Sequence, residues 1–206
     1  SQGQRLKTAL ARALVHSPRN VVLDEPTNGL DVMAVRNLRV LLQRLRAAGA
    51  VIIGRTNLSP MAFSPLGVNR DFGTPGNPAD RTRIPGGSSS GAAVSVTDGM
   101  AVAAIGSDTG GSIRMPAAFC GIAGIKPTQT RVPLTKTWPL STTLDSVGPL
   151  APSIACCALV DAALAGETII VPDAIPLKGL RFALPMSGVL DDMDATILRI
   201  LQAGCT

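Results

Sequence analysis

Two Gly-Gly-Ser turns, at residues 86–88 and 110–112, lie 24 residues apart around an apolar segment. The glycines leave no side chains beside each serine, so the backbone can turn tightly and aim its N–H groups at a bound oxygen. A serine next to such amides offers a nucleophile together with donors for the charge on a tetrahedral adduct. One such turn would be read as a flexible loop. Two of them predict an acyl-transfer site.

A serine hydroxyl is a poor nucleophile until a base takes its proton. His16 is the only histidine of the chain and lies far from both turns in the sequence. A hydroxyl relay that ends in a desolvated, neutral lysine can replace a histidine, because burial lowers the pKa of a lysine. The two serines are therefore candidates for a nucleophile and a relay.

Several specific strings, in the same order, resemble the amidase-signature family of serine hydrolases from about residue 46 to the C-terminus. They are GAVIIGRTN, GGSSSG, GSDTGGSIRMPAAFCGIAGIKPT and TLDSVGPLA. The resemblance implies an α/β fold in which helices cover a mixed central β-sheet. It also implies that Ser112 is the nucleophile, that Ser88 is the relay on a cis peptide bond, and that the amides of Thr109, Gly110, Gly111 and Ser112 form the oxyanion hole.

The family's catalytic lysine lies upstream of the GAVIIG strand, in a segment that this chain does not contain. Arg55 stays charged and cannot act as a base. Lys126 matches a family position where a structural role is expected, and Lys7 is the only lysine upstream. We therefore expect a Ser112 acyl-enzyme of weakened activity, better with small-molecule esters than with amides. Which acyl group it accepts stays open.

The first 45 residues resemble a different family, the ATP-binding domain of ABC transporters. Ser1–Gln4 resembles its signature loop, Val21–Glu25 its Walker B strand and Asn28–Asp31 its D-loop, whereas no GxxxxGK[ST] phosphate loop occurs in the chain. The bland interpretation of the Asp-Glu-Pro-Thr-Asn-Gly run is a strand that ends in a capped turn. We expect a chimera of an ATPase-like fragment (1–45) and a partial amidase core (46–206), packed as two parts or as one domain.

Three functions remain open at this point: an active serine hydrolase, a catalytically silent chimera, and an ATP-binding fragment. The net charge of +5 does not indicate nucleic-acid binding, because residues 1–50 hold eight Arg/Lys against three Asp/Glu and the rest is balanced. Aromatic residues, at 2%, are too few for a base-stacking platform.

The four cysteines have no metal-ligand spacing, so we expect reduced core thiols and neither a metal nor a cofactor. No signal peptide or long apolar span is evident, which predicts a cytoplasmic protein without a membrane partner. The family's C-terminal part is missing, and an exposed sheet edge would favour a homo-oligomer.

Apolar runs predict strands at residues 51–54, 100–105 and 180–184, and helical spacing predicts helices at 88–96, 153–164 and 192–201. Residues 69–84 and 127–152 are rich in Gly and Pro and are expected to be mostly loop. The acidic cluster Asp191, Asp192 and Asp194 is expected to cap a helix.

Overall fold

The computed structural model describes residues 42–134, 139–170, 173, 176, 178–181, 188 and 191–203. The chain divides into two compact units, Ser1–Pro172 and Asp173–Thr206. Apart from residues 42–45, the ATPase-like segment lies outside the described residues, and so does Lys7. Their assignments stay predictions.

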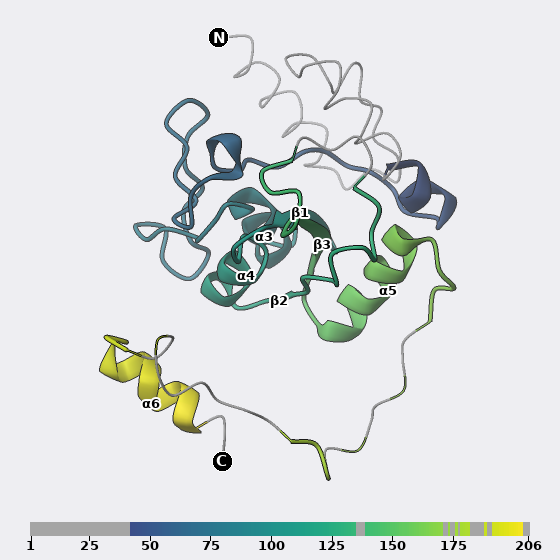
Figure 1. Cartoon of the computed structure of the whole chain (residues 1–206). Helices are drawn as coiled ribbons and strands as arrows, with labels where there is room; N and C mark the ends of the chain where they lie inside the picture. Colours follow the sequence, from purple (N-terminus) through teal and green to yellow (C-terminus); the bar gives the residue numbers. More distant parts are fainter. Residues whose placement is uncertain are drawn as a thin grey trace. The chain divides into compact units, whose positions relative to one another are not determined.

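The first unit is built on a small antiparallel sheet of order β1-β3-β2 (Figure 1). Its strands are β1 (Ala104–Asp108), β2 (Ala123–Gly124) and β3 (Ser146–Ala151). The central strand β3 lies in a segment expected to be loop, so that prediction is wrong for these six residues. Gly148 and Pro149 are ordinary strand breakers. Pro149 has no N–H to donate, but its carbonyl still accepts from the Ile125 amide at 3.1 Å.

Two predicted strands are absent from the described residues. Residues 51–54 have no strand pairing, and Val51 is 62% exposed, so the prediction of a buried strand there is wrong. Residues 180 and 181 are not in a strand either, and residues 182–184 lie outside the described part. The third predicted strand begins four residues later than expected, at Ala104.

Three helices flank the sheet (Figure 1): α3 (Ser90–Thr97), α4 (Arg114–Cys120) and α5 (Ile154–Ala165). The predicted helices at 88–96 and 153–164 are confirmed as α3 and α5. Ser153 caps α5 by accepting the Cys156 amide at 3.2 Å. The helix ends at Gly166, where φ is 75°, a conformation that suits glycine.

The core between α3, α4 and the sheet consists of small and branched apolar side chains. Its buried members are Ala92, Ala93, Val94, Ile113, Ala117, Cys120 and Leu150. Ser88 and Ser112 each lie two residues before one of the two helices that build this core. The packing of α3 against α4 therefore fixes where both serine turns begin.

The second unit contains α6 (Ala195–Ala203). Asp194 caps it, because its Oδ1 accepts the amides of Thr196 at 2.8 Å and Ile197 at 3.3 Å. The predicted capping role is thus confirmed for Asp194, and the helix predicted from residue 192 begins three residues later. In the part of the chain that is described, no helix is long and apolar enough to span a membrane.

Candidate active site

The turn at residues 109–112 is organised from inside by Asp108, the last residue of β1. Asp108 is fully buried, and its Oδ1 accepts the Gly111 amide at 2.7 Å. Its Oδ2 accepts the amides of Ile113 at 3.1 Å and Arg114 at 3.4 Å. One carboxylate therefore holds the backbone on both sides of Ser112.

Arg114 supplies the counter-charge for this buried carboxylate. Its Nε donates to Asp108 Oδ2 at 3.1 Å and its Nη2 to Oδ1 at 3.0 Å. Burial alone would raise the pKa of Asp108, but the hydrogen bonds from Arg114, Ile113 and Gly111 outweigh it and hold that pKa below its usual value. Asp108 is therefore ionised. This residue was not among the candidates predicted from the sequence, and an Asp two residues before a Gly-Gly-Ser turn is the pattern that could have indicated it.

The amides predicted to form the oxyanion hole differ in their hydrogen bonds. The Gly111 amide donates to Asp108 Oδ1. Among the described residues, nothing accepts a hydrogen bond from the amides of Gly110 or Ser112. Gly110 is also exposed, and nothing lies within 4 Å of the place where its Cβ would be. The oxyanion hole of Thr109, Gly110, Gly111 and Ser112 stays a prediction, and the amides of Gly110 and Ser112 are its donors without an acceptor in the described residues.

The two Gly-Gly-Ser turns meet in space. The Ser89 amide donates to the Ser112 carbonyl at 3.2 Å, and the Ser89 hydroxyl donates to the Ser107 carbonyl at 3.4 Å. Ser112 itself is half-buried just before α4. The structure therefore brings the predicted nucleophile and the residue after the predicted relay into direct backbone contact.

Ser88 is buried, and the peptide bond between Gly87 and Ser88 is cis, as the family resemblance implied. Its hydroxyl has no hydrogen-bond partner among the described residues. The Ser88 hydroxyl is therefore not hydrogen-bonded to Ser112 in the structure. Ser90, two residues further on, is also buried with an unpartnered hydroxyl.

The Ser88 turn packs tightly on the chain before it. The Ser59 amide donates to the Ser88 carbonyl at 3.0 Å, and the Gly87 amide donates to the Pro65 carbonyl at 2.7 Å. A Cβ on Gly87 would lie 2.5 Å from the Gly67 nitrogen, so only glycine fits this position. Because these two backbone segments pack closely, they fix the position of the Ser88 backbone.

No described residue places a base on the Ser88 hydroxyl. Lys126 Nζ donates to the Pro127 carbonyl at 2.8 Å, beside its own backbone, which fits the structural role expected for it. Arg55 is exposed. The structure thus places neither of these two cations on the predicted relay.

The predicted loop at 69–84 leads along the chain into the first serine turn and is ordered by two buried asparagines that the sequence did not single out. Asn69 Oδ1 accepts the amides of Asp71 and Phe72, each at 3.0 Å. Asn77 Nδ2 donates to the Phe119 carbonyl at 2.9 Å and so ties the loop to the end of α4. These contacts fix the turn at residues 69–72 and hold the loop to the end of α4.

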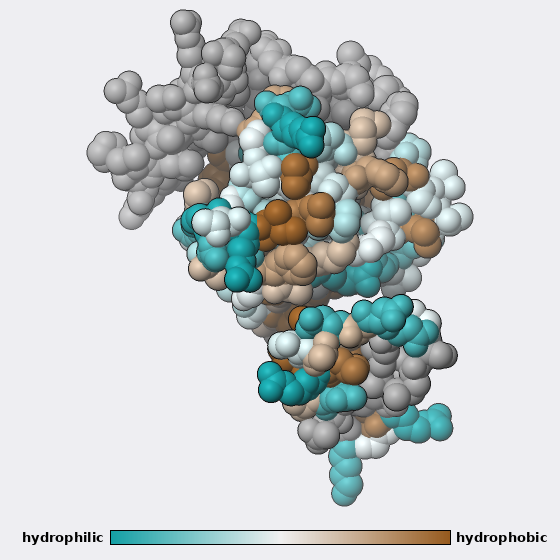
Figure 2. Space-filling view, turned by 90° about the vertical axis from the view of Figure 1, so that its left-hand side faces the viewer, coloured by the Kyte–Doolittle hydropathy of each residue, from teal (hydrophilic) through white to brown (hydrophobic). Residues whose placement is uncertain are grey.

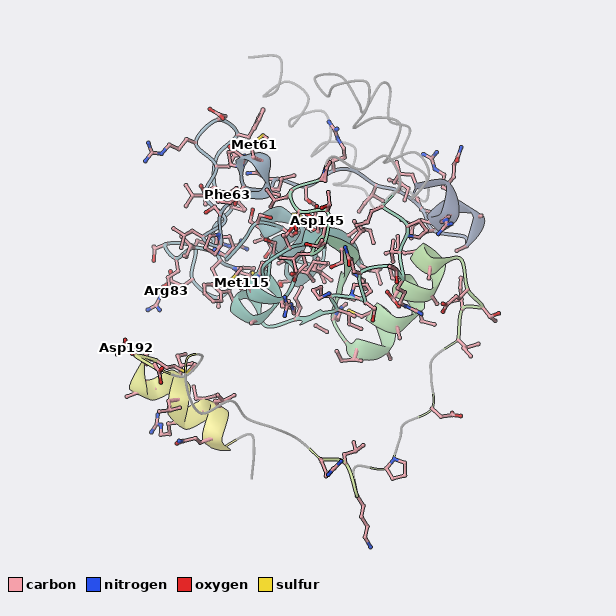
Figure 3. The ribbon with its side chains drawn as sticks, in the orientation of Figure 1. Met61, Phe63, Arg83, Met115, Asp145 and Asp192 are labelled. Carbon is pink, nitrogen blue, oxygen red and sulfur yellow. The ribbon has the colours of Figure 1, made fainter. Side chains whose placement is uncertain are left out.

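The short helix η1 (Pro60–Ala62) carries apolar side chains on the surface next to this loop. Met61 and Phe63 are 75% and 78% exposed, and Figure 3 shows both at the rim of the first unit. Figure 2 shows the same side of the molecule, where apolar side chains lie among polar ones. This part of the surface is therefore partly apolar.

The model of the family described as Amidase matches residues 39–202. The chain belongs to the amidase family. It is 40% identical over 175 residues to a glutamyl-tRNA(Gln) amidotransferase subunit of Carboxydothermus hydrogenoformans, a match that covers 79% of this chain and 36% of the relative. It is also 40% identical over 167 residues to the 2-amino-5-chloromuconic acid deaminase of Comamonas testosteroni, with the same coverages.

The structure of the amidase-family chain is similar to that of native peptide amidase from Stenotrophomonas maltophilia. The two share 44% identity with a TM-score of 0.58, over 62% of this chain and 27% of the peptide amidase. The family and the α/β fold predicted from the sequence are confirmed by these matches. The chain spans about a third of the length of the curated relatives it matches. The family match begins at residue 39, so the ATPase resemblance before it stays a prediction.

Proposed function

We propose that this amidase-family chain is a serine hydrolase that cleaves small-molecule amides or esters through an acyl-enzyme on Ser112. The observation that carries the proposal is the turn held by Asp108, which presents a half-buried serine beside amides without acceptors. Such preorganised donors stabilise the charge that develops on the carbonyl oxygen. The amidase, amidotransferase and deaminase names of the relatives favour carbon–nitrogen bonds as the ancestral target.

In the proposed reaction, Ser112 Oγ attacks the substrate carbonyl and its proton leaves through the Ser88 hydroxyl. The amides of Gly110 and Ser112 donate to the oxyanion, and its collapse expels the alcohol or amine, which takes up the relayed proton. Water then attacks the carbonyl carbon of the acyl-enzyme. The bond between that carbon and Ser112 Oγ breaks, which restores the Ser112 hydroxyl. The carboxylic acid is the second product.

The base at the end of this relay is the weak part of the proposed mechanism. Loss of a general base typically costs about 10²- to 10⁴-fold in rate. An alkoxide or phenolate leaves more readily than an amine, which must first be protonated. We therefore infer weakened activity that favours activated esters over amides.

Labelling with a fluorophosphonate probe and hydrolysis of an aryl ester test the proposal. The wild type and Ser107→Ala, which alters a nearby exposed serine, should both be labelled and hydrolyse the ester. Ser112→Ala should lose both signals. Equal ester hydrolysis by Ser112→Ala and the wild type would show that another residue is the nucleophile. An unlabelled wild type would favour the catalytically silent chimera.

A further inference from the structure

Asp145 joins the loop at 139–145 to the first residue of the nucleophile turn. Its Oδ1 accepts the Thr109 hydroxyl at 2.5 Å. Its Oδ2 accepts the amides of Leu140 at 2.7 Å and Ser141 at 3.0 Å. Each carboxylate oxygen thus serves a different segment: one holds the turn and the other holds the loop. Figure 3 shows Asp145 in the middle of the first unit.

The residue after Asp145 makes a second contact to the same end of the turn. The Ser146 hydroxyl donates to the Asp108 carbonyl at 3.0 Å, and these two residues form the last pair in the β1–β3 register. Consecutive residues of one segment therefore contact consecutive residues of the other. The start of β3 is registered to the start of the turn at two adjacent points.

The Thr109 contact is of a kind that restrains the backbone. A hydrogen bond from a hydroxyl to an ionised carboxylate is roughly twice as strong as one between neutral groups. Threonine is β-branched and stiff at χ1, so fixing its hydroxyl also fixes the orientation of its peptide groups. Asp108 holds the turn at Gly111 and beyond, and Asp145 holds it at Thr109.

We propose that Asp145 is a positioning residue for the nucleophile turn, acting through Thr109 to fix the amides that precede Ser112. Its catalytic meaning rests on the proposed function, and its effect on the turn does not. If Asp145 only stabilised the loop, its contacts through Oδ2 to the two loop amides would be sufficient, and the contact of Oδ1 with Thr109 would have no effect on the rate. Because Oδ1 is hydrogen-bonded to Thr109 and Oδ2 to the loop amides, a substitution at Thr109 removes the contact with the turn and leaves the contacts with the loop.

Kinetics on the full chain make this separation. Thr109→Val removes the donor to Oδ1 and leaves the loop amides, so the fluorophosphonate labelling rate and the kcat for an aryl ester should fall about 10-fold or more with little change in KM. Thr109→Ser keeps the hydroxyl and should restore most of the rate. Asp145→Ala removes the acceptor of the Thr109 hydroxyl and should lower the rate at least as much as Thr109→Val, and the double variant should be no worse than Asp145→Ala, because the two residues act as one unit.

The matched control is Asp80→Asn. Asp80 also accepts a threonine hydroxyl, from Thr82 at 2.6 Å, but on an exposed loop. The labelling rate and the kcat of Asp80→Asn should equal those of the wild type. Full activity of Thr109→Val, or additive losses in the double variant, would overturn the proposal.

Hydrogen exchange provides a readout that does not depend on activity. Amides in the peptide that covers residues 109–113 should exchange faster in Thr109→Val and Asp145→Ala than in the wild type or Asp80→Asn, whereas those of α5 should not change. Unchanged exchange at 109–113 would reject the positioning role. If the wild type is never labelled at Ser112, the proposed function fails, and the exchange result still decides whether Asp145 positions the turn.

Discussion

The carboxylate of Asp108 and the guanidinium of Arg114 form a two-point ion pair in which only one partner is buried. The Arg114 side chain is 54% exposed and that of Asp108 is 0% exposed. Water can reach the cation if the pair breaks, whereas the carboxylate would be left in the interior with backbone amides alone. The two residues therefore contribute unequally to stability.

Replacement of Arg114 tests this asymmetry. Arg114→Met should lower the free energy of unfolding by about 2 kcal/mol, because it leaves a buried carboxylate without its counter-ion. Arg114→Lys should recover part of the loss, since it restores the charge without the two-point geometry. Urea unfolding gives the comparison. A change below about 0.5 kcal/mol for Arg114→Met would show that the backbone amides suffice.

Stability should depend on pH through Asp108. Its pKa is lower in the folded chain than in the unfolded one, so its contribution is complete above the unfolded pKa, near 3.9, and is lost as the pH falls through the folded pKa. Thermal unfolding should show a Tm that declines below about pH 4. Asp108→Asn should lower the Tm at neutral pH and flatten this acid decline. Asp80→Asn should leave the acid decline largely intact, because Asp80 is exposed and its contacts are screened.

The cysteines should differ in reactivity. Burial, together with the nearby charge of Asp98, raises the pKa of Cys120 to about 11, so its thiol stays protonated at pH 8. Burial also raises the pKa of Cys157, whereas Cys156 is only half-buried. Alkylation at pH 8 followed by mass spectrometry should therefore modify Cys156 well before Cys120 and Cys157. A sample in denaturant gives the alkylation rate of each cysteine when it is fully accessible. Equal rates for the three cysteines in the native protein would contradict the burial of Cys120 and Cys157.

Two glycines four residues apart should respond differently to alanine. A Cβ on Gly106 would lie 2.6 Å from the Ser89 hydroxyl and 3.0 Å from Leu150, whereas one on Gly110 meets nothing within 4 Å. Gly106→Ala should destabilise the fold by about 1–3 kcal/mol through overpacking, and Gly110→Ala should leave stability nearly unchanged. Chemical denaturation of both variants checks this. Equal stabilities would mean that β1 shifts to accommodate the methyl group.

The helices α3, α5 and α6 were predictable because their information is local. Ser153 and Gly166 mark the ends of α5 in the sequence as they do in the structure. The strand β3 was missed because Gly148 and Pro149 are locally unfavourable, and only pairing on both sides makes that segment a strand. A strand forms only when it pairs with another strand, and the local sequence pattern does not indicate which segment that will be.

The roles of the site residues stay predictions from the family strings, and the structure adds contacts that those strings do not express. The contact between Ser89 and Ser112 joins the two turns that the sequence singled out. The role of Asp108 depends on amides three to six residues further along the chain, and that of Asp145 on a hydroxyl 36 residues away. Such partners become apparent only once the backbone is folded.

The close backbone contacts of Gly67, Gly87 and Gly91 divide this region into positions that can vary and positions that cannot. A Cβ on Gly91 would lie 2.5 Å from the Asn57 nitrogen, much as one on Gly87 would from Gly67. Met61 and Phe63, in contrast, project from the surface. A library of this chain would keep most members folded if it randomised codon 63 and left the three glycine codons fixed, whereas codon 61 is restricted because Met61 has a φ of 55°.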